Sequence, residues 1–158
     1  MYTLLLVDDE EEVIEVIARK VKWEELGFSV IGHANNGYKA LEMLEEVQPD
    51  VVMTDIKMPY MDGLKLCGHI KERYPATKIL LFTGFDDFEY AKEAVHLEIE
   101  EYILKPLNLA EITKVFENLR QKLDQERNEK RNADLLRKYY DESLPLLQAN
   151  FYSTLIEG

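Results

Sequence analysis

Three carboxylates, a hydroxyl and an ammonium group stand directly after short apolar segments of this chain. The pair Asp8 and Asp9 follows the first such segment, Asp55 the third, Thr83 the fourth and Lys105 the fifth. Like charges near 4 Å repel by about 4 kcal/mol at an effective dielectric near 20, so carboxylates gathered at one place need a cation. Oxygen ligands at an open site suit Mg²⁺, which keeps several waters and takes one or two carboxylates.

An aspartate beside a hard cation, a hydroxyl and a lysine can accept a phosphoryl group, because that transfer demands mainly positioning and charge stabilisation. In this interpretation Asp55 is the nucleophile. Asp8 and Asp9 hold the metal, and Thr83 and Lys105 bind the phosphoryl oxygens. Each residue alone has an ordinary explanation, since strand-end aspartates are common in turns and acidic pairs favour helix starts. The hypothesis depends on the joint arrangement after four segments.

The apolar segments are typical of strands. Those at 3–7, 51–54 and 79–82 are continuously apolar, as expected for strands covered on both faces. The segment at 28–32 is weaker and predicts an edge strand, and a fifth strand is expected at 102–104. Amphipathic segments with helical spacing follow the strands, at 13–21, 40–47, 64–74, 88–95 and 112–123.

Residues that favour helix starts support several of these helices. Asp86 with Glu89, and Asn108 with Glu111, have the spacing of a cap residue and the third helical residue, and Asn36 and Asp62 are further cap candidates. Residues 23–27 are expected to form a turn. Five β-then-α units predict an α/β fold with a doubly wound parallel sheet and right-handed crossovers. Such sheets place their sites at the carboxyl ends of strands.

Composition limits the partners. The net charge of −12 opposes contact with DNA phosphate and anionic lipid, so this stretch is not expected to bind DNA itself. No apolar run approaches the roughly 20 residues needed to cross a membrane, and no signal peptide is expected. The single cysteine, Cys67, falls on an apolar helical stripe and indicates a core position and a reducing, cytoplasmic setting. Three scattered histidines do not suggest a metal site.

Five motifs, taken together in their order and spacing, resemble the receiver domain of two-component response regulators over about residues 1–121. They are LLLVDDE at 4–10, TDIKMP at 54–59, MDG at 61–63, LFTG at 81–84 and YILKP at 102–106. The resemblance implies a flavodoxin-like (βα)5 sheet with strand order 2-1-3-4-5. It implies that Asp55 takes its phosphoryl group from a sensor histidine kinase. Such a domain is a phosphoacceptor that assists its own phosphorylation and dephosphorylation rather than an enzyme.

The resemblance also implies further roles. The main-chain carbonyl of Lys57 joins the aspartates as a Mg²⁺ ligand, and Gly84 belongs with the phosphoryl-binding residues. Lys105-Pro106 is implied to be a cis peptide. Thr83 moves toward the phosphoryl group and the ring of Tyr102 swings inward, which alters an output face formed by helix 88–95, strand 102–104 and the last helix. Lys57 departs from the small polar residue of chemotaxis receivers, and the sequence does not give the sign of its effect.

A narrower resemblance concerns receivers joined to AraC-type helix-turn-helix domains. It is carried by WEELGF at 23–28, by GFDDFEYA at 84–91 and by the apolar pattern of 144–155, which Pro145 interrupts. Residues 122–158 are expected to form a helical linker toward a DNA-binding output domain beyond this stretch. The tail past Leu123 is expected to favour a homodimer, although Glu126 and Lys130 interrupt its heptad pattern.

Three other functions remain open at this point. A haloacid-dehalogenase-type phosphatase also uses a strand-end aspartate with Mg²⁺, but it wants a second aspartate two residues later, where this chain has Lys57. A nucleotide- or flavin-binding module would need a phosphate-cradling loop, whereas the loop after the first strand is acidic. A pseudo-receiver adaptor is disfavoured because Asp9, Asp55, Thr83 and Lys105 are all present.

Overall fold

The computed structural model of this chain describes residues 1–84, 92 and 98–157, with side chains up to residue 143. The chain divides into two compact units, Met1–Glu117 and Asn118–Gly158. Among the described helices, none is both long enough and apolar enough to span a membrane.

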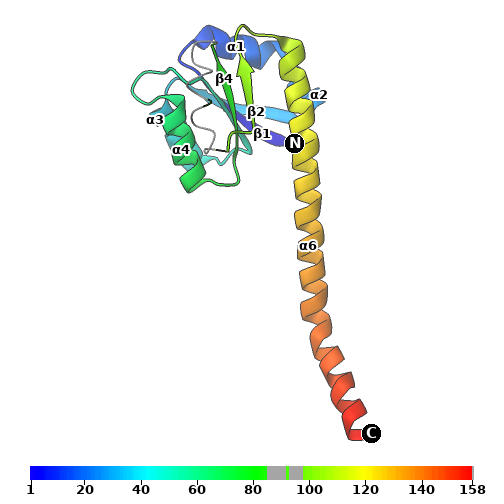
Figure 1. The fold of residues 1–158 in the computed structure, drawn as a ribbon. Coiled ribbons are helices and arrows are strands. Elements are labelled where there is room, and N and C mark those ends of the chain that lie inside the picture. The colour runs from blue at the N-terminus through cyan, green and yellow to red at the C-terminus, as the bar shows by residue number, and fades with distance from the viewer. Residues whose placement is uncertain (85–91, 93–97, 158) are drawn as a thin grey trace. The chain divides into compact units, whose positions relative to one another are not determined.

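A five-stranded parallel sheet forms the centre of the first unit (Figure 1). Its order is β2-β1-β3-β4-β5, which confirms the expected α/β fold and the edge position of β2. The strands are β1 (Tyr2–Val7), β2 (Phe28–Ala34), β3 (Val51–Thr54), β4 (Lys78–Thr83) and β5 (Glu101–Leu104).

The register of the sheet decides which side chains meet at its carboxyl edge. Val7 of β1 pairs with Thr54 of β3, so the residues that follow them leave the sheet side by side. Thr83 of β4 pairs with Leu104 of β5, and the N–H of Lys105 donates to the Thr83 carbonyl at 2.7 Å. These two pairings, together with the parallel pairing of β3 and β4 between them, bring the expected site residues to one edge.

Burial in the core explains why the sequences of β1, β3 and β4 are continuously apolar. Helices cover both faces of the sheet (Figure 1), so every residue of β3, the last four residues of β1 and the last five of β4 are buried. One face packs against α3 and α4 and includes Cys67, which is fully buried as expected. The strand β2 instead alternates buried and exposed residues, and its pairing with β1 shifts register between Leu4 and Leu5.

Three of the expected caps begin helices. Asn36 accepts a hydrogen bond from Lys39 N at 2.9 Å at the start of α3 (Gly37–Glu46), and Asp62 accepts one from Lys65 N at 2.8 Å at the start of α4 (Gly63–Arg73). Asn108 accepts from Glu111 N at 3.1 Å before α6 (Leu109–Glu157). The expected helix at 88–95, with its cap at Asp86 and Glu89, lies outside the described residues.

Residues 23–27 differ from the expected turn. They form a short helix, α2 (Trp23–Leu26), which ends where Gly27 adopts a left-handed conformation with φ of 87°. Trp23 makes edge-on contacts with Phe116 at 4.7 Å and with Phe28 at 6.4 Å between ring centroids. A single helical turn is too short to produce a periodic pattern, and its position is determined by burial of this tryptophan.

The last helix confirms the expected C-terminal helical extension, and it runs past the apolar pattern of 112–123. The helical backbone of α6 continues across residue 121 and through Pro145 to Glu157. Pro145 therefore interrupts the apolar pattern without ending the helix.

Candidate functional site

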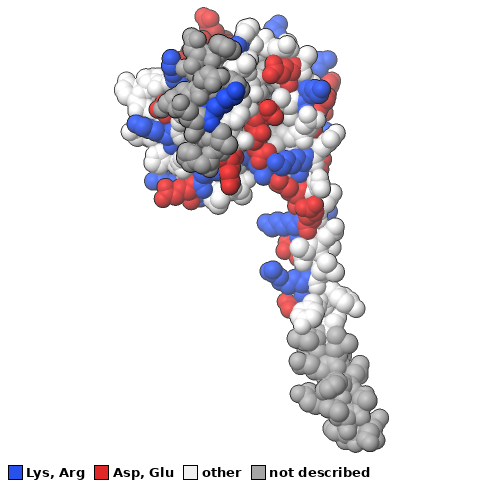
Figure 2. Space-filling model, in the orientation of Figure 1, with Lys and Arg blue, Asp and Glu red and all other residues white. Residues whose placement is uncertain are grey.

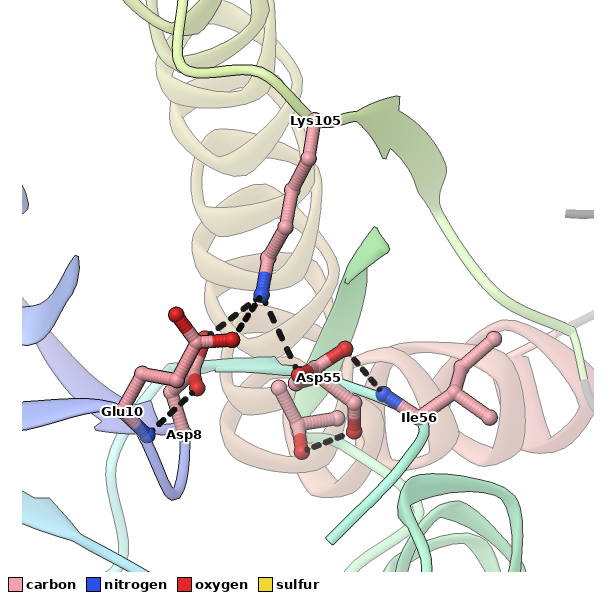
Figure 3. Close-up of polar contacts among 6 residues, drawn as sticks. Asp8, Glu10, Asp55, Ile56 and Lys105 are labelled. Carbon is pink, nitrogen blue, oxygen red and sulfur yellow. Dashed lines mark hydrogen bonds and ion pairs between the residues drawn. The ribbon is translucent and has the colours of Figure 1, made fainter. Parts of the chain in front are cut away.

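The strand ends gather two buried carboxylates around one lysine (Figure 3). The ammonium nitrogen of Lys105 lies 3.2 Å from Oδ2 of Asp8 and 3.2 Å from Oδ2 of Asp55. The side chains of Asp8 and Asp55 are only 5% and 8% exposed, and that of Lys105 is 21% exposed. The lysine therefore neutralises part of a charge cluster that water reaches poorly.

Each aspartate is oriented by its own backbone. Oδ1 of Asp8 accepts a hydrogen bond from the N–H of Glu10 at 2.9 Å, and Oδ1 of Asp55 accepts one from Ile56 at 2.7 Å. The remaining oxygen of each carboxylate is the one that faces Lys105. The main chain at Asp55 is held in turn, because its N–H donates to the Val7 carbonyl at 2.9 Å.

A close backbone contact fastens the loop that follows Asp55. The N–H of Gly63 donates to the Ile56 carbonyl at 2.7 Å, and a Cβ atom at Gly63 would collide with the main-chain oxygen of Asp55. Only glycine allows this approach. Within the same loop, Tyr60 adopts a left-handed conformation with φ of 71°. The MDG motif therefore ends in glycine because only glycine lets the loop lie against the main chain of Asp55.

Thr83 ends β4 with its hydroxyl fully buried. Among the described residues, its Oγ1 has no hydrogen-bond partner. A buried polar group without a partner is rare and calls for an explanation. An incoming ligand with oxygen acceptors would satisfy this hydroxyl. Gly84 follows directly, and a Cβ atom there would meet nothing within 4 Å.

Burial controls the proton affinities at the site. Burial raises the pKa of Asp8 from 3.8 to about 6, against the opposing effect of hydrogen bonding from the Glu10 main chain and of Lys105. Burial likewise raises the pKa of Asp55, although Lys105 opposes it. Burial lowers the pKa of Lys105, but its two aspartate partners outweigh that effect and raise it. The site therefore favours binding of a further positive charge.

A divalent cation fits the donor set. One carboxylate oxygen each from Asp8, Asp9, Glu10 and Asp55 lie within 4.8 Å of one another. Hard oxygen donors beside an exposed edge suit Mg²⁺. The sequence predicts Asp8, Asp9 and Asp55 as ligands, and Glu10 is an addition from the structure. The available signal was its place directly after the aspartate pair. The role of the Lys57 carbonyl stays a prediction, and the Lys57 side chain is exposed.

Two further expectations concern β5 and the loop after it. The peptide bond Lys105-Pro106 is cis, as the resemblance implies. Tyr102 is half-buried and packs against the core cluster that contains Cys67, and burial raises the pKa of its hydroxyl. Its role as a switch residue stays a prediction. Of the expected output face, helix 88–95 lies outside the described residues.

Comparison with known proteins agrees with this geometry. Residues 4–117 match the model of the response regulator receiver domain. A Bacillus subtilis (strain 168) protein described as an uncharacterized transcriptional regulatory protein, YesN, is 36% identical over 158 residues, which are 100% of this chain and 43% of that protein. The chain spans about half the length of the curated relatives it matches.

Solved structures show the same fold. The receiver (REC) domain of AraT, a response regulator from Geobacillus stearothermophilus, has a TM-score of 0.77 and 35% identity, covering 80% of this chain and 98% of that one. A two-component transcriptional regulator AraC from Clostridium phytofermentans has a TM-score of 0.74 and 30% identity, with the same coverage. With a family match over residues 4–117 and these relatives, the chain belongs to the response regulator receiver domain family.

Proposed function

We propose that this receiver domain accepts a phosphoryl group on Asp55 from the phosphohistidine of a sensor histidine kinase, with Mg²⁺ bound. The observation that carries the proposal is the shared ion pair at the sheet edge. Lys105 Nζ lies 3.2 Å from one oxygen of Asp55 and 3.2 Å from one oxygen of Asp8. At the end of the adjacent strand, the Thr83 hydroxyl is buried and lacks a partner among the described residues.

The chain's own residues supply nucleophile, positioning and charge. Oδ2 of Asp55 forms a bond to phosphorus as the bond from phosphorus to the histidine nitrogen breaks, which gives an acyl phosphate. Lys105 already contacts this oxygen, so its ammonium lies where phosphoryl charge arrives. The Thr83 hydroxyl donates to a second phosphoryl oxygen, which satisfies its missing hydrogen bond.

A bound Mg²⁺ would offset the negative charge of the carboxylates and of the phosphoryl group. Asp8, Asp9, Asp55 and the main-chain carbonyl of Lys57 would hold it. The carboxylate members of this set have oxygens within 4.8 Å of one another.

Phosphorylation then changes the surface that controls an output. Thr83 and Tyr102 lie on adjacent strands, where Leu81 pairs with Tyr102 and Thr83 with Leu104. A shift of Thr83 toward the phosphoryl group frees space into which the Tyr102 ring moves, and the altered face includes β5 and the start of α6, together with the segment 88–95 that the sequence predicts as a helix. Two relatives are described as transcriptional regulators, so we propose a DNA-binding output in the longer protein and a cytoplasmic setting.

An aspartyl-phosphate phosphatase is the second candidate, because it shares the strand-end aspartate and the need for Mg²⁺. It requires an acid two residues after the nucleophile, and this chain has exposed Lys57 there. Turnover of a small phosphate ester, such as p-nitrophenyl phosphate, would favour this candidate.

The deciding experiment is incubation with acetyl phosphate and Mg²⁺, followed by intact-mass spectrometry. We expect one phosphoryl adduct per chain that requires Mg²⁺, is labile to acid and to base as an acyl phosphate is, and is absent in Asp55→Asn. The matched control is Asp134→Asn, an exposed aspartate of α6, which should gain the adduct at the wild-type rate. Equal adduct formation in Asp55→Asn and wild type would disprove the assignment.

A further inference from the structure

Glu10 is the exposed carboxylate beside Lys105. Its Oε1 lies 3.8 Å from Lys105 Nζ, and its side chain is 63% exposed, in contrast to the buried carboxylates of Asp8 and Asp55. Figure 3 shows these three carboxylates around the single ammonium. Lys105 therefore has an additional acidic neighbour that is open to solvent.

The backbone leaves the Glu10 side chain available for this contact. Glu10 is the cap residue of α1 (Glu11–Lys20), but its side chain makes no capping hydrogen bond. Its N–H donates to Oδ1 of Asp8 at 2.9 Å. The main chain thus fixes Glu10 next to the buried cluster, while the carboxylate reaches the lysine.

A negative charge at Glu10 has opposite effects on the binding of a divalent cation and on the binding of a phosphoryl group. An oxygen of Glu10 lies within 4.8 Å of ligand oxygens of Asp8, Asp9 and Asp55, so its charge adds to the attraction for a divalent cation. The same charge repels an incoming phosphoryl group and competes with it for Lys105. Thr83, whose carbonyl accepts from the Lys105 N–H, has a buried hydroxyl that lacks a partner among the described residues, and this independently indicates a ligand with oxygen acceptors at the same edge of the sheet.

We infer that Glu10 is a positioning residue that strengthens binding of the divalent cation and weakens binding of the phosphoryl group at Asp55. The inference rests on the proposed function of Asp55. Through its contact with Lys105, Glu10 favours the metal-bound, unphosphorylated form of the domain. It also makes small anionic phosphodonors poorer substrates, because each must approach Lys105 past this charge.

The experiment compares Glu10→Gln with wild type in two calorimetric titrations. The first uses Mg²⁺ alone, and the second uses beryllofluoride, a phosphoryl mimic, at saturating Mg²⁺. We expect the Kd for Mg²⁺ to rise and the Kd for beryllofluoride to fall, each by about three-fold for partly solvated charges at these distances. Both differences should shrink at about 0.5 M salt, because exposed charges are screened.

The matched control is Glu15→Gln, which makes the same charge change on α1. Glu15 is exposed and its side chain forms no hydrogen bond or ion pair among the described residues, so both Kd values should stay at wild type. A general loss of structure in Glu10→Gln would weaken both ligands. The inference is therefore wrong if the two Kd values move in the same direction or match those of Glu15→Gln. If wild type fails to bind beryllofluoride, or Asp55→Asn binds it equally well, the proposed function fails instead.

Discussion

The main chain of Gly63 lies so close to the main chain of Asp55 that no side chain fits between them. A Cβ atom at residue 63 would collide with the main-chain oxygen of Asp55. The Gly63 N–H donates to the carbonyl of Ile56 at 2.7 Å. The first turn of α4 therefore lies directly against the backbone of Asp55, the proposed phosphoacceptor. Stability and phosphoryl acceptance should for this reason be coupled at Gly63.

Gly63→Ala should destabilise the domain by about 1–3 kcal/mol, because overpacking forces the backbone apart. Phosphorylation by acetyl phosphate should slow as Asp55 shifts. The control is Gly68→Ala in the same helix, where an added Cβ meets nothing within 4 Å. That change should stabilise by about 0.5–1 kcal/mol, since alanine favours helix over glycine. Urea unfolding measures both, and equal stability of the two variants would refute the close-contact argument.

Asp8→Asn should stabilise the metal-free protein at neutral pH. Burial raises the pKa of Asp8 to about 6, above its ordinary 3.8, so the fold favours the protonated acid. The stability that this preference provides is complete below about pH 4 and is lost as the pH rises through 6. Because one pKa unit corresponds to about 1.4 kcal/mol, asparagine should gain up to about 3 kcal/mol at pH 7.5.

The measurement is thermal unfolding of both proteins in EDTA from pH 4 to pH 8. The gain of Asp8→Asn should vanish near pH 4. With Mg²⁺ added, the order should reverse at pH 7.5, because only wild type keeps the full set of carboxylate ligands. A gain that is independent of pH would argue against a raised pKa at Asp8.

The positions of the strand ends could be predicted because the apolar runs and their alternation with helices are long-range regularities of the sequence. That is why the convergence of Asp8, Asp55 and Lys105 followed from order alone. The contact of Glu10 with Lys105 could not be predicted, since it depends on one side-chain rotamer at a helix start. The collision at Gly63 likewise depends on the path of a loop, for which the sequence offers only the motif.

Residues of α6 provide a separate prediction about self-association. Four apolar side chains of the second unit, Leu135, Leu136, Tyr139 and Tyr140, are each 58–71% exposed. Leu136 and Tyr140 are four residues apart and lie on one face of the helix. We expect a weak homodimer in sedimentation velocity, and Leu136→Gln with Tyr140→Gln should return it to monomer, whereas Arg131→Gln should not. A wild-type chain that stays monomeric at high concentration would exclude this.

Thr83→Val should weaken beryllofluoride binding without lowering the stability of the metal-free protein. The hydroxyl is fully buried and has no partner among the described residues, so an isosteric methyl should leave the metal-free stability unchanged or raise it by up to about 1 kcal/mol. Beryllofluoride affinity should nevertheless fall by about ten-fold, because a hydrogen bond to a charged group is lost.

Thr54→Val gives the contrast, because the Thr54 hydroxyl donates to the main-chain oxygen of Asp55 at 2.9 Å. Its loss should cost about 1 kcal/mol of stability, as expected for a satisfied buried hydrogen bond. Chemical unfolding and beryllofluoride titration of the two variants together decide the role of Thr83. If Thr83→Val is destabilised as much as Thr54→Val and binds beryllofluoride like wild type, the hydroxyl serves the fold, and the phosphoryl group must be held by Lys105 and the metal alone.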